Sequence, residues 1–396
     1  MNPILSHARA LAEEIGPRGT GSRGEEAAAD YVAGQLTQLG VLIERHSFRA
    51  VASQNAFPLA ICAVALIAFT LFPLDGQAGR WIAALLAVST APLLWNTIRT
   101  SDSPLRFLLP KVTSRNVVAR IEPAGEPRQH VVILAHLDTN RCRLAWQSSA
   151  ARSLERLTFL TLAVFASLGA IYLVEAWLAG SDGNGRWAWY FSFLPMAYVA
   201  GMVITLWKDD RTPFSPGAHD NAASVAVALE VGARLAASPL EQTQVWLAFT
   251  GAEETDHAGL YTLLQKYDST LRSAVFLGLE GLGSGELVYL TRQGLCSHYR
   301  PDKALEALAA GVSAARPELD VRAAEIIGED ETGTLRRAGY RALCIAGLDP
   351  ATRTLPHWHR PDDTVDTLSE PFMERAASFI LALLERIDAN ALAPEG

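Results

Sequence analysis

The chain has 396 residues, of which 49% are hydrophobic, and its formal net charge at pH 7 is −8. This length allows two average domains, or one large α/β domain with insertions. Because the charge is negative and the basic residues form no long run, the composition speaks against nucleic acid as a partner. Four scattered cysteines (Cys62, Cys142, Cys296 and Cys344) form neither a disulfide framework nor a C-x-x-C pair.

The first polar segment, residues 2–14, has the pattern of an amphipathic helix and lacks the apolar core of a cleavable signal peptide. A Gly-rich loop and a second helix follow in GPRGTGSRGEEAAADYVAGQLTQLG. VLIERHSF is a strand pattern, and SRNVVARIEP is another. We expect these two strands to pair as neighbours, with an apolar hairpin in place of their turn.

Four apolar segments hold the hydrophobic excess, and they fall into two hairpins, residues 52–98 and 157–207. Each segment is about as long as the ~20 residues that cross a hydrocarbon core, and Trp stands at several of their ends. Polar turns, Asp75 to Arg80 and Ala179 to Arg186, connect the members of each pair. We therefore predict four transmembrane helices; the alternative is four buried helices of a large soluble core.

Basic residues are distributed asymmetrically around these hairpins. The two turns contribute only Arg80 and Arg186. The opposite ends are flanked by Arg45, Arg49, Arg99, Arg106, Lys111, Arg141, Arg143, Arg152, Arg156, Lys208 and Arg211. We expect an integral protein of a bacterial inner membrane. The positive-inside rule places its polar domain on the cytoplasmic side.

The polar remainder, residues 1–51, 99–156 and 208–396, has the alternation of a single α/β domain. Strand patterns (HVVILAHLD, TQVWLAFTG, SAVFLGLEG and YRALCIAG) alternate with helical ones, the last running from Pro371 to Asn390. This order predicts a central mixed, largely parallel sheet flanked by helices. In such sheets, sites form at the carboxyl ends of the strands.

Polar clusters stand at those ends. His136 ends the first of these strands and can bind a metal, and Asp138 can orient a ligand from two residues further on. Asp220 precedes a helix, where it can act as an N-cap or bridge two cations. The adjacent Glu253 and Glu254 repel each other unless a metal is present; one can ligate while the other serves as a base.

Two further clusters complete the pattern. Glu280 lies within an apolar strand, where an unpaired carboxylate costs several kcal/mol. His357 and His359 lie in a loop before the last helix. Mixed His and carboxylate ligands suit zinc, with manganese or cobalt as substitutes. His219, beside Asp220, is not expected to be a ligand.

The order AHLDT, GAHDNAAS, FTGAEE, LGLEG, HRPDDT resembles the co-catalytic zinc aminopeptidase family, whose relatives include bacterial leucyl aminopeptidases, glutamate carboxypeptidase II and the glutaminyl cyclases. The resemblance spans the chain except for the two hairpins. It implies a zinc-exopeptidase fold and metal-assisted hydrolysis by two zinc ions. By resemblance, His136 and Glu280 bind one zinc, Glu254 and His359 bind the other, and Asp220 bridges them. Glu253 is the general base, and Asp138 orients His136.

The sequence departs from the family at two positions. Glu280 stands where Asp is more common, which changes the reach of that ligand. Trp358 stands where some relatives carry a Tyr that donates to the oxyanion, so the oxyanion donor here is not identified.

We expect a membrane-anchored metallo-exopeptidase, most simply an aminopeptidase that acts on peptides. A glutaminyl cyclase with one zinc and a non-catalytic membrane scaffold are the alternatives. Because the second hairpin separates His136 from Asp220, we also expect the bilayer as a partner and a preference for hydrophobic or membrane-proximal peptides. The sequence leaves open the natural substrate, the choice between aminopeptidase and carboxypeptidase, and the oligomeric state.

Overall fold

The computed structural model describes residues 3–74, 76–99, 103–143, 153–178 and 187–390. The chain divides into two compact units. The first, here called the catalytic unit, comprises residues 1–52, 111–147 and 213–396. The second, the helical unit, comprises residues 53–110 and 148–212.

The catalytic unit is built on one eight-stranded sheet in the order β1-β2-β4-β3-β5-β8-β6-β7. Its strands are β1 (Leu42–Val51), β2 (Lys111–Ile121), β3 (Gln129–His136), β4 (Thr243–Thr250), β5 (Val275–Glu280), β6 (Glu286–Arg292), β7 (Val321–Glu325) and β8 (Arg341–Leu348). The four central strands, β4, β3, β5 and β8, run parallel. Antiparallel pairs flank them, β1 with β2, β2 with β4, and β6 with β8. The predicted mixed sheet with a parallel centre is therefore confirmed.

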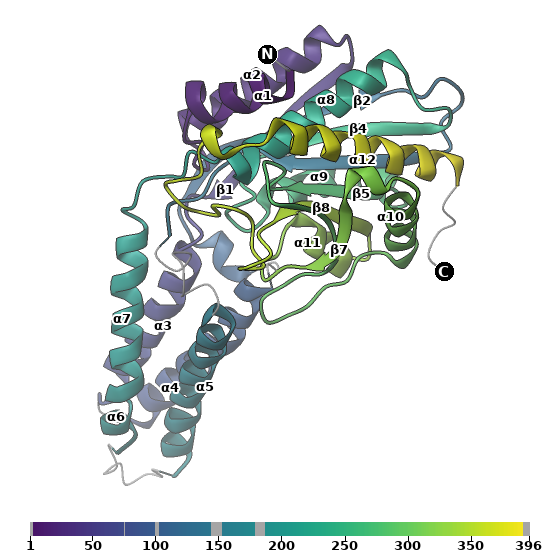
Figure 1. Ribbon diagram of the computed structural model, residues 1–396. Coiled ribbons are helices and arrows are strands. Elements are labelled where there is room, and N and C mark those ends of the chain that lie inside the picture. Colours follow the sequence, from purple (N-terminus) through teal and green to yellow (C-terminus); the bar gives the residue numbers. More distant parts are fainter. Residues whose placement is uncertain (1–2, 75, 100–102, 144–152, 179–186, 391–396) are drawn as a thin grey trace. The chain divides into compact units, whose positions relative to one another are not determined.

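Helices cover both faces of this sheet (Figure 1). One face carries α1 (Pro3–Arg9), α2 (Arg23–Gln38), α8 (Ser224–Ala237), α10 (Lys303–Ala315) and α12 (Glu370–Ala389), whose apolar residues share one core cluster with the strands. The other face carries α9 (Ala258–Leu271) and α11 (Glu331–Arg337). Burial on both faces explains why the central strands are nearly continuous apolar runs in sequence.

Most of the predicted elements of this unit are present. β1 and β2 pair antiparallel as expected, with Val51 opposite Lys111 at the point where the first hairpin leaves and returns. Three elements were not predicted from the sequence: β6, β7 and α11. β7 (VRAAE) has no alternating apolar pattern, and α11 has only seven residues, so local periodicity could not reveal either.

The helical unit contains α3 (Ala56–Leu71), α4 (Gln77–Ile98), α5 (Leu154–Leu178), α6 (Trp187–Phe191) and α7 (Phe193–Asp209). Among the described residues, only α4 and α5 are long and apolar enough to cross a membrane. The prediction of four full-length spans is therefore not confirmed. α3 has 16 residues, and the fourth apolar segment is divided between α6 and α7 at Ser192.

The predicted hairpin turns also change. α4 begins at Gln77, so Arg80 lies in its first turn, where its side chain is buried, and not in a polar turn. The predicted turn Ala179 to Arg186 lies outside the described residues.

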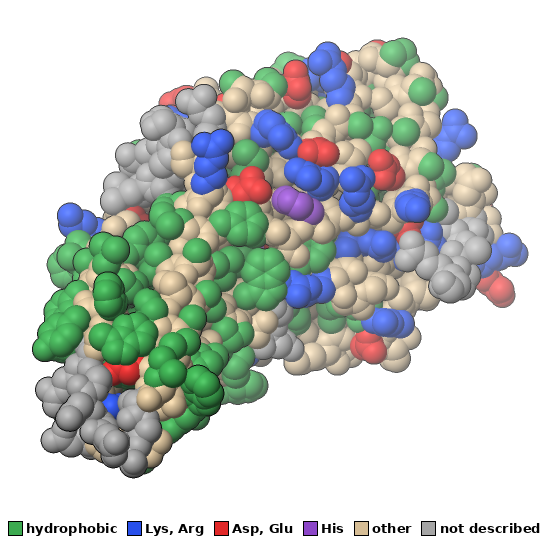
Figure 2. Space-filling model, turned by 90° about the horizontal axis from the view of Figure 1, so that it is seen from below, with side chains coloured by type: hydrophobic (Ala, Val, Ile, Leu, Met, Phe, Trp, Pro, Cys, Tyr) green, Lys and Arg blue, Asp and Glu red, His purple; other side chains and the backbone are tan. Residues whose placement is uncertain are grey.

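Large hydrophobic side chains are exposed almost exclusively on the helical unit. Of those described as exposed, all but Leu42 belong to this unit, and they include Leu85, Phe159, Trp177 and Leu194. Figure 2 shows hydrophobic side chains over most of the face that these helices present in that view. In the most apolar stretches of α4 and α5 only 28% of the residues are buried. Apolar surface of this extent is unusual for a protein surrounded by water on all sides.

Candidate metal centre

Five predicted ligands come together at the carboxyl edge of the parallel strands. His136 is the last residue of β3 and Glu280 the last of β5, and Glu254 follows the end of β4. These three strands are parallel neighbours, so their ends share one edge of the sheet. Asp220 lies in a turn that precedes α8, and His359 lies in the loop before α12.

The ligand atoms form two groups that share one residue. His136, Asp220 and Glu280 make the first group, and Asp220, Glu254 and His359 make the second. In the first, His136 Nε2 lies 3.1 Å from Asp220 Oδ1 and 3.5 Å from Glu280 Oε2. In the second, His359 Nε2 lies 3.1 Å from both Asp220 Oδ2 and Glu254 Oε1. Asp220 thus turns one carboxylate oxygen toward each group.

The electrostatics of the site indicate missing positive charge. Burial works against protonation of His136, yet the carboxylates of Glu253 and Glu280 raise its pKa well above the usual value. Burial also opposes protonation of His359, but Glu254 and Asp220 raise its pKa to about 9. Burial raises the pKa of both Glu253 and Glu280 well above the ordinary range. Carboxylates crowd this buried site without enough cations of the protein's own to balance them.

This donor set fits zinc. Two imidazoles and three carboxylates are ligands that zinc accepts, and a divalent ion supplies the charge that the site lacks. Asp220 is buried, and burial opposes ionisation of its carboxylate, but His136 and His359 hold its pKa below the usual range. Its Oδ2 makes no well-aligned hydrogen bond, and its neighbour there is His359 Nε2 at 3.1 Å. A buried carboxylate in this setting is costly unless a cation compensates its charge. His136, Asp220, Glu254, Glu280 and His359 would therefore hold the metal.

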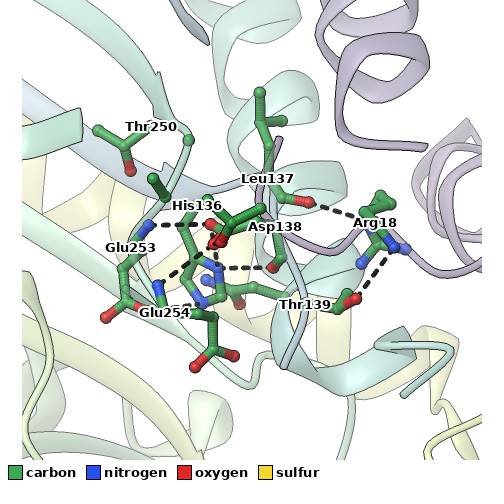
Figure 3. A network of polar contacts seen from close by, with 12 residues as sticks. Arg18, His136, Leu137, Asp138, Thr139, Thr250, Glu253 and Glu254 are labelled. Carbon is green, nitrogen blue, oxygen red and sulfur yellow. Dashed lines mark hydrogen bonds and ion pairs between the residues drawn. The ribbon is translucent and has the colours of Figure 1, made fainter. Parts of the chain in front are cut away.

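Asp138 makes different contacts from those expected. His136 Nδ1 lies 3.0 Å from the backbone carbonyl of Asp138, whereas the nearest carboxylate oxygen is 3.7 Å away. The carboxylate instead accepts the backbone N–H groups of Glu253 (3.0 Å) and Glu254 (3.3 Å) and the hydroxyl of Thr20 (2.8 Å). Figure 3 shows Asp138 directed at this Glu–Glu segment. Asp138 thus holds His136 through its main chain and the two glutamates through its side chain.

Glu253 belongs to neither ligand group, and a histidine lies against it. Its Oε1 is 3.2 Å from His257 Nε2, and His257 Nδ1 is 2.9 Å from the hydroxyl of Thr334. The other oxygen, Oε2, lies 3.9 Å from His136 Nε2. Glu253 therefore lies next to the candidate ligands without belonging to either of their groups.

The loop that carries Asp220 is held by Asp363. Asp363 accepts the backbone N–H of His219 at 2.7 Å and that of Asp220 at 3.3 Å. His219 uses both ring nitrogens, toward Asp363 Oδ1 at 3.1 Å and Ser284 Oγ at 2.7 Å, and it is absent from both ligand groups. His357 is likewise outside these groups and lies 3.0 Å from Asp362.

Arg18, which the sequence did not single out as a functional residue, ties the loops beneath the site together. It is 1% exposed, and its guanidinium donates to five backbone carbonyls, at 2.8–3.1 Å: Leu11, Gly16, Leu137, Pro216 and Gly217. Its backbone N–H also donates to Thr139 (Figure 3). Arg18 therefore links the segment after His136 to the segment before Asp220.

Replacing Arg18 with Met is expected to lower the free energy of unfolding by about 3 kcal/mol, because five buried carbonyls lose a charged donor. Urea unfolding of the full chain in detergent, followed by tryptophan fluorescence, measures this loss. Arg316→Met, at a half-exposed arginine on the surface, is the matched control. A change at Arg18 no larger than that of the control would contradict the assigned role.

The sequence analysis did not identify four buried polar residues around the site. Each of them contacts a candidate ligand, the residue next to one, or a loop that carries one. Arg18, Asn140, His257 and Asp363 are polar side chains, none more than 6% exposed, and each hydrogen-bonds a ligand, its neighbour or the loop beside it. Of these four residues, Asp363 lies in the HRPDDT motif of the family resemblance, and Arg18 lies in the Gly-rich loop before the second helix. Asn140 and His257 carry no local signal that distinguishes them from surface residues.

Solved structures with a similar fold are zinc enzymes and cyclases. A Zn-dependent exopeptidase from Parabacteroides distasonis has a TM-score of 0.57 and 12% identity over 97% of both chains. The zinc aminopeptidase BSAP from Bacillus subtilis has a TM-score of 0.55 and 14% identity over 97% of this chain and 94% of that one. A glutaminyl cyclase from Bacteroides thetaiotaomicron has a TM-score of 0.55 and 14% identity over 97% and 96%. Identities this low show the fold alone.

Sequence comparison is informative for the second half of the chain. Residues 209–384 match peptidase family M28. This range contains Asp220, both glutamates after β4, Glu280 and His359, whereas His136 lies outside it. No curated protein matches the chain.

Proposed function

We propose that this chain, whose residues 209–384 match peptidase family M28, is a zinc metallopeptidase and, more narrowly, a membrane-anchored two-zinc exopeptidase that removes N-terminal residues from peptides. The observation that carries the proposal is the pair of ligand groups joined by Asp220. A single metal would need only one of these groups. The presence of both, with an unliganded carboxylate beside them, supports two zincs and hydrolytic chemistry.

The roles of the residues follow from their contacts. His136 and Glu280 would hold one zinc, Glu254 and His359 the other, and Asp220 both. When bound, zinc supplies Lewis-acid charge that makes water more acidic and polarises a carbonyl group. Glu253 takes a proton from the attacking water and returns it to the leaving amine, a role that suits a buried carboxyl with a raised pKa. Asp138 and His257 hold Glu253 in position for both transfers.

Membrane anchoring is supported by the surface of the helical unit. α4 and α5 have the length and composition of spans, and α3 and α7 would accompany them as shorter apolar helices. Exposed Trp177, Trp187 and Trp207 near helix ends suit the interfacial region of a bilayer. The lipid bilayer is thus the partner that we assign to these helices, and the flanking Lys and Arg residues favour a cytoplasmic catalytic unit in a bacterial inner membrane.

The proposal is tested by comparing substrates on the purified full chain. Aminoacyl reporters should be cleaved, a chelator should abolish the cleavage, and added zinc should restore it. Conversion of peptides with N-terminal Gln, without release of free amino acids, would support the glutaminyl cyclase alternative. Inactivity towards both substrates in a zinc-loaded chain would support a non-catalytic scaffold. Retention of the chain in membranes washed with alkaline carbonate tests the anchoring separately.

Replacing His257 with Ala is expected to lower kcat about ten-fold, because Glu253 Oε1 loses the imidazole nitrogen that lies 3.2 Å away, and a polar contact to a charged group is worth about 1.5 kcal/mol or more. Without this neighbour the ionised form of Glu253 is less favoured and its pKa rises, so the acidic limb of the rate profile moves to higher pH. Zinc content should not change. His298→Ala, at an exposed histidine whose ring nitrogen lies 3.2 Å from the Gly294 carbonyl, is the control. An unchanged kcat and profile would remove His257 from the account.

A further inference from the structure

Two short segments of the catalytic unit, residues 140–143 and 213–217, form a neck at the base of the second apolar hairpin. Cys142 donates its backbone N–H to Pro213 O at 2.8 Å, and Ser215 donates to Asn140 O at 2.8 Å. Between these bonds, Arg141 and Phe214 form an antiparallel bridge. The guanidinium of Arg141 also covers the Phe214 ring, 4.2 Å from its centroid. The segment that carries α5, α6 and α7 is therefore inserted between two chain segments that are already joined.

The neck reaches the second ligand group directly. Asn140 Nδ2 donates to Glu254 Oε2 at 2.6 Å, and the backbone N–H of Arg143 donates to the carbonyl of His359 at 3.1 Å. Glu254 and His359 are the two ligands that this group does not share with the first. His136 belongs to the first group. The hydrogen bond described for its Nδ1 joins it to the backbone carbonyl of Asp138 and not to the neck.

The orientation of the Asn140 amide is fixed by its other contacts. Its Oδ1 accepts the backbone N–H of Arg141 at 2.8 Å and Nε of Arg143 at 3.0 Å. The NH₂ group must then face Glu254, where it engages Oε2 and leaves Oε1 turned toward His359 Nε2, 3.1 Å away. Asn140 is only 5% exposed, so water does not replace these bonds readily.

We propose that Asn140 is a positioning residue through which the neck of the second apolar hairpin sets the zinc affinity of the Glu254–His359 half of the site. It acts by holding Glu254 with one oxygen presented to the metal. Outer-shell partners of metal ligands are worth about 10- to 100-fold in affinity. The inference rests on the proposed two-zinc function. It adds that the neck, from which the second apolar hairpin extends along the chain, sets the affinity for one of the two zinc ions.

Equilibrium dialysis of the full chain in detergent, against a chelator buffer of set free zinc, tests the proposal. Asn140→Ala should lower the binding affinity for one of the two zinc ions about 10- to 100-fold and leave the affinity for the other unchanged. In a Glu280→Gln background the variant should keep this effect. In a Glu254→Gln background it should add little, because the ligand through which it acts has already been altered. Asn390→Ala, which removes one side-chain hydrogen bond at the end of α12, is the matched control.

Several outcomes would overturn the inference. Unchanged affinity in Asn140→Ala, or equal weakening of both zincs, would remove the specific role of Asn140. If Asn140→Ala does not fold, Arg143→Gln serves as the second variant, because it removes the Nε donor to Asn140 Oδ1 and keeps the Asn140 amide that donates to Glu254. A smaller loss of affinity for the same zinc ion is then expected. No loss of affinity would count against the proposal. Fewer than two zincs in the unmodified chain would overturn the proposed function as well, whereas two zincs and no effect of the variant would overturn this inference alone.

Discussion

Glu253→Gln is expected to lower kcat for aminoacyl substrates by about a hundred- to ten-thousand-fold, the usual contribution of a general acid–base residue. Gln matches Glu in size but cannot take a proton from water or return one to the leaving amine. Because Glu253 is in neither ligand group, the zinc content should remain that of the unmodified chain. Its backbone N–H still donates to Asp138, so the segment should keep its conformation.

Kinetics and elemental analysis of the same preparation check this result. Glu374→Gln makes the same chemical change at a half-exposed carboxylate on α12, which pairs with Arg234, and should leave kcat unchanged. Full activity in Glu253→Gln would show that another group carries the proton. Loss of zinc along with activity would show that Glu253 acts as a ligand.

Asp220→Ala is expected to reduce bound zinc to below one ion per chain and kcat/KM by at least about a thousand-fold, or roughly 4 kcal/mol of transition-state stabilisation. Asp220 is the only described residue that belongs to both ligand groups, and each of its oxygens lies 3.1 Å from a different histidine. Its removal takes a ligand from both metals at once. It also leaves His136 and His359 without the carboxylate between them.

The comparison with other ligand variants makes this test specific. His359→Ala should affect mainly one zinc, whereas Asp220→Ala should affect both. Asp268→Ala, at an exposed aspartate that accepts the Tyr340 hydroxyl, controls for the loss of an acidic side chain. Retention of one tightly bound zinc in Asp220→Ala would contradict a bridging role.

The sequence was most informative at the ends of the buried strands. His136 and Glu280 end apolar runs, and parallel strands bring such ends to one edge of a sheet, so their proximity could be predicted without coordinates. Asp220 and His359 lie in loops; their residue types made them candidates, and the resemblance to a family supplied their assignment to particular zincs. The structure brings all five predicted ligands into the two groups; their roles as ligands remain predictions.

The contacts around the ligands could not be predicted. Arg18 meets Gly217 and Asn140 meets Glu254 across 199 and 114 positions of the chain, and no local pattern records such a pairing. The carboxylate of Asp138 illustrates the limit: besides lying 3.7 Å from His136 Nδ1, it accepts the backbone N–H groups of Glu253 and Glu254, and no local pattern records those bonds.

The apolar segments show a different limit. The sequence shows how long an apolar segment is. A transmembrane span also requires that the segment form one uninterrupted helix, which the sequence does not show. α4 and α5 meet both conditions, while α3 ends at Leu71 and the fourth segment is divided at Ser192. The exposed apolar side chains of these helices, which only the structure reveals, are now the stronger argument for a bilayer.

The central claim is that two zincs are held by two ligand groups that share Asp220. Elemental analysis of the purified full chain, after dialysis that removes loosely bound metal, tests this claim most directly. We expect two zincs per chain in the unmodified protein. A single zinc, or none, in a folded chain that cleaves aminoacyl reporters would contradict it.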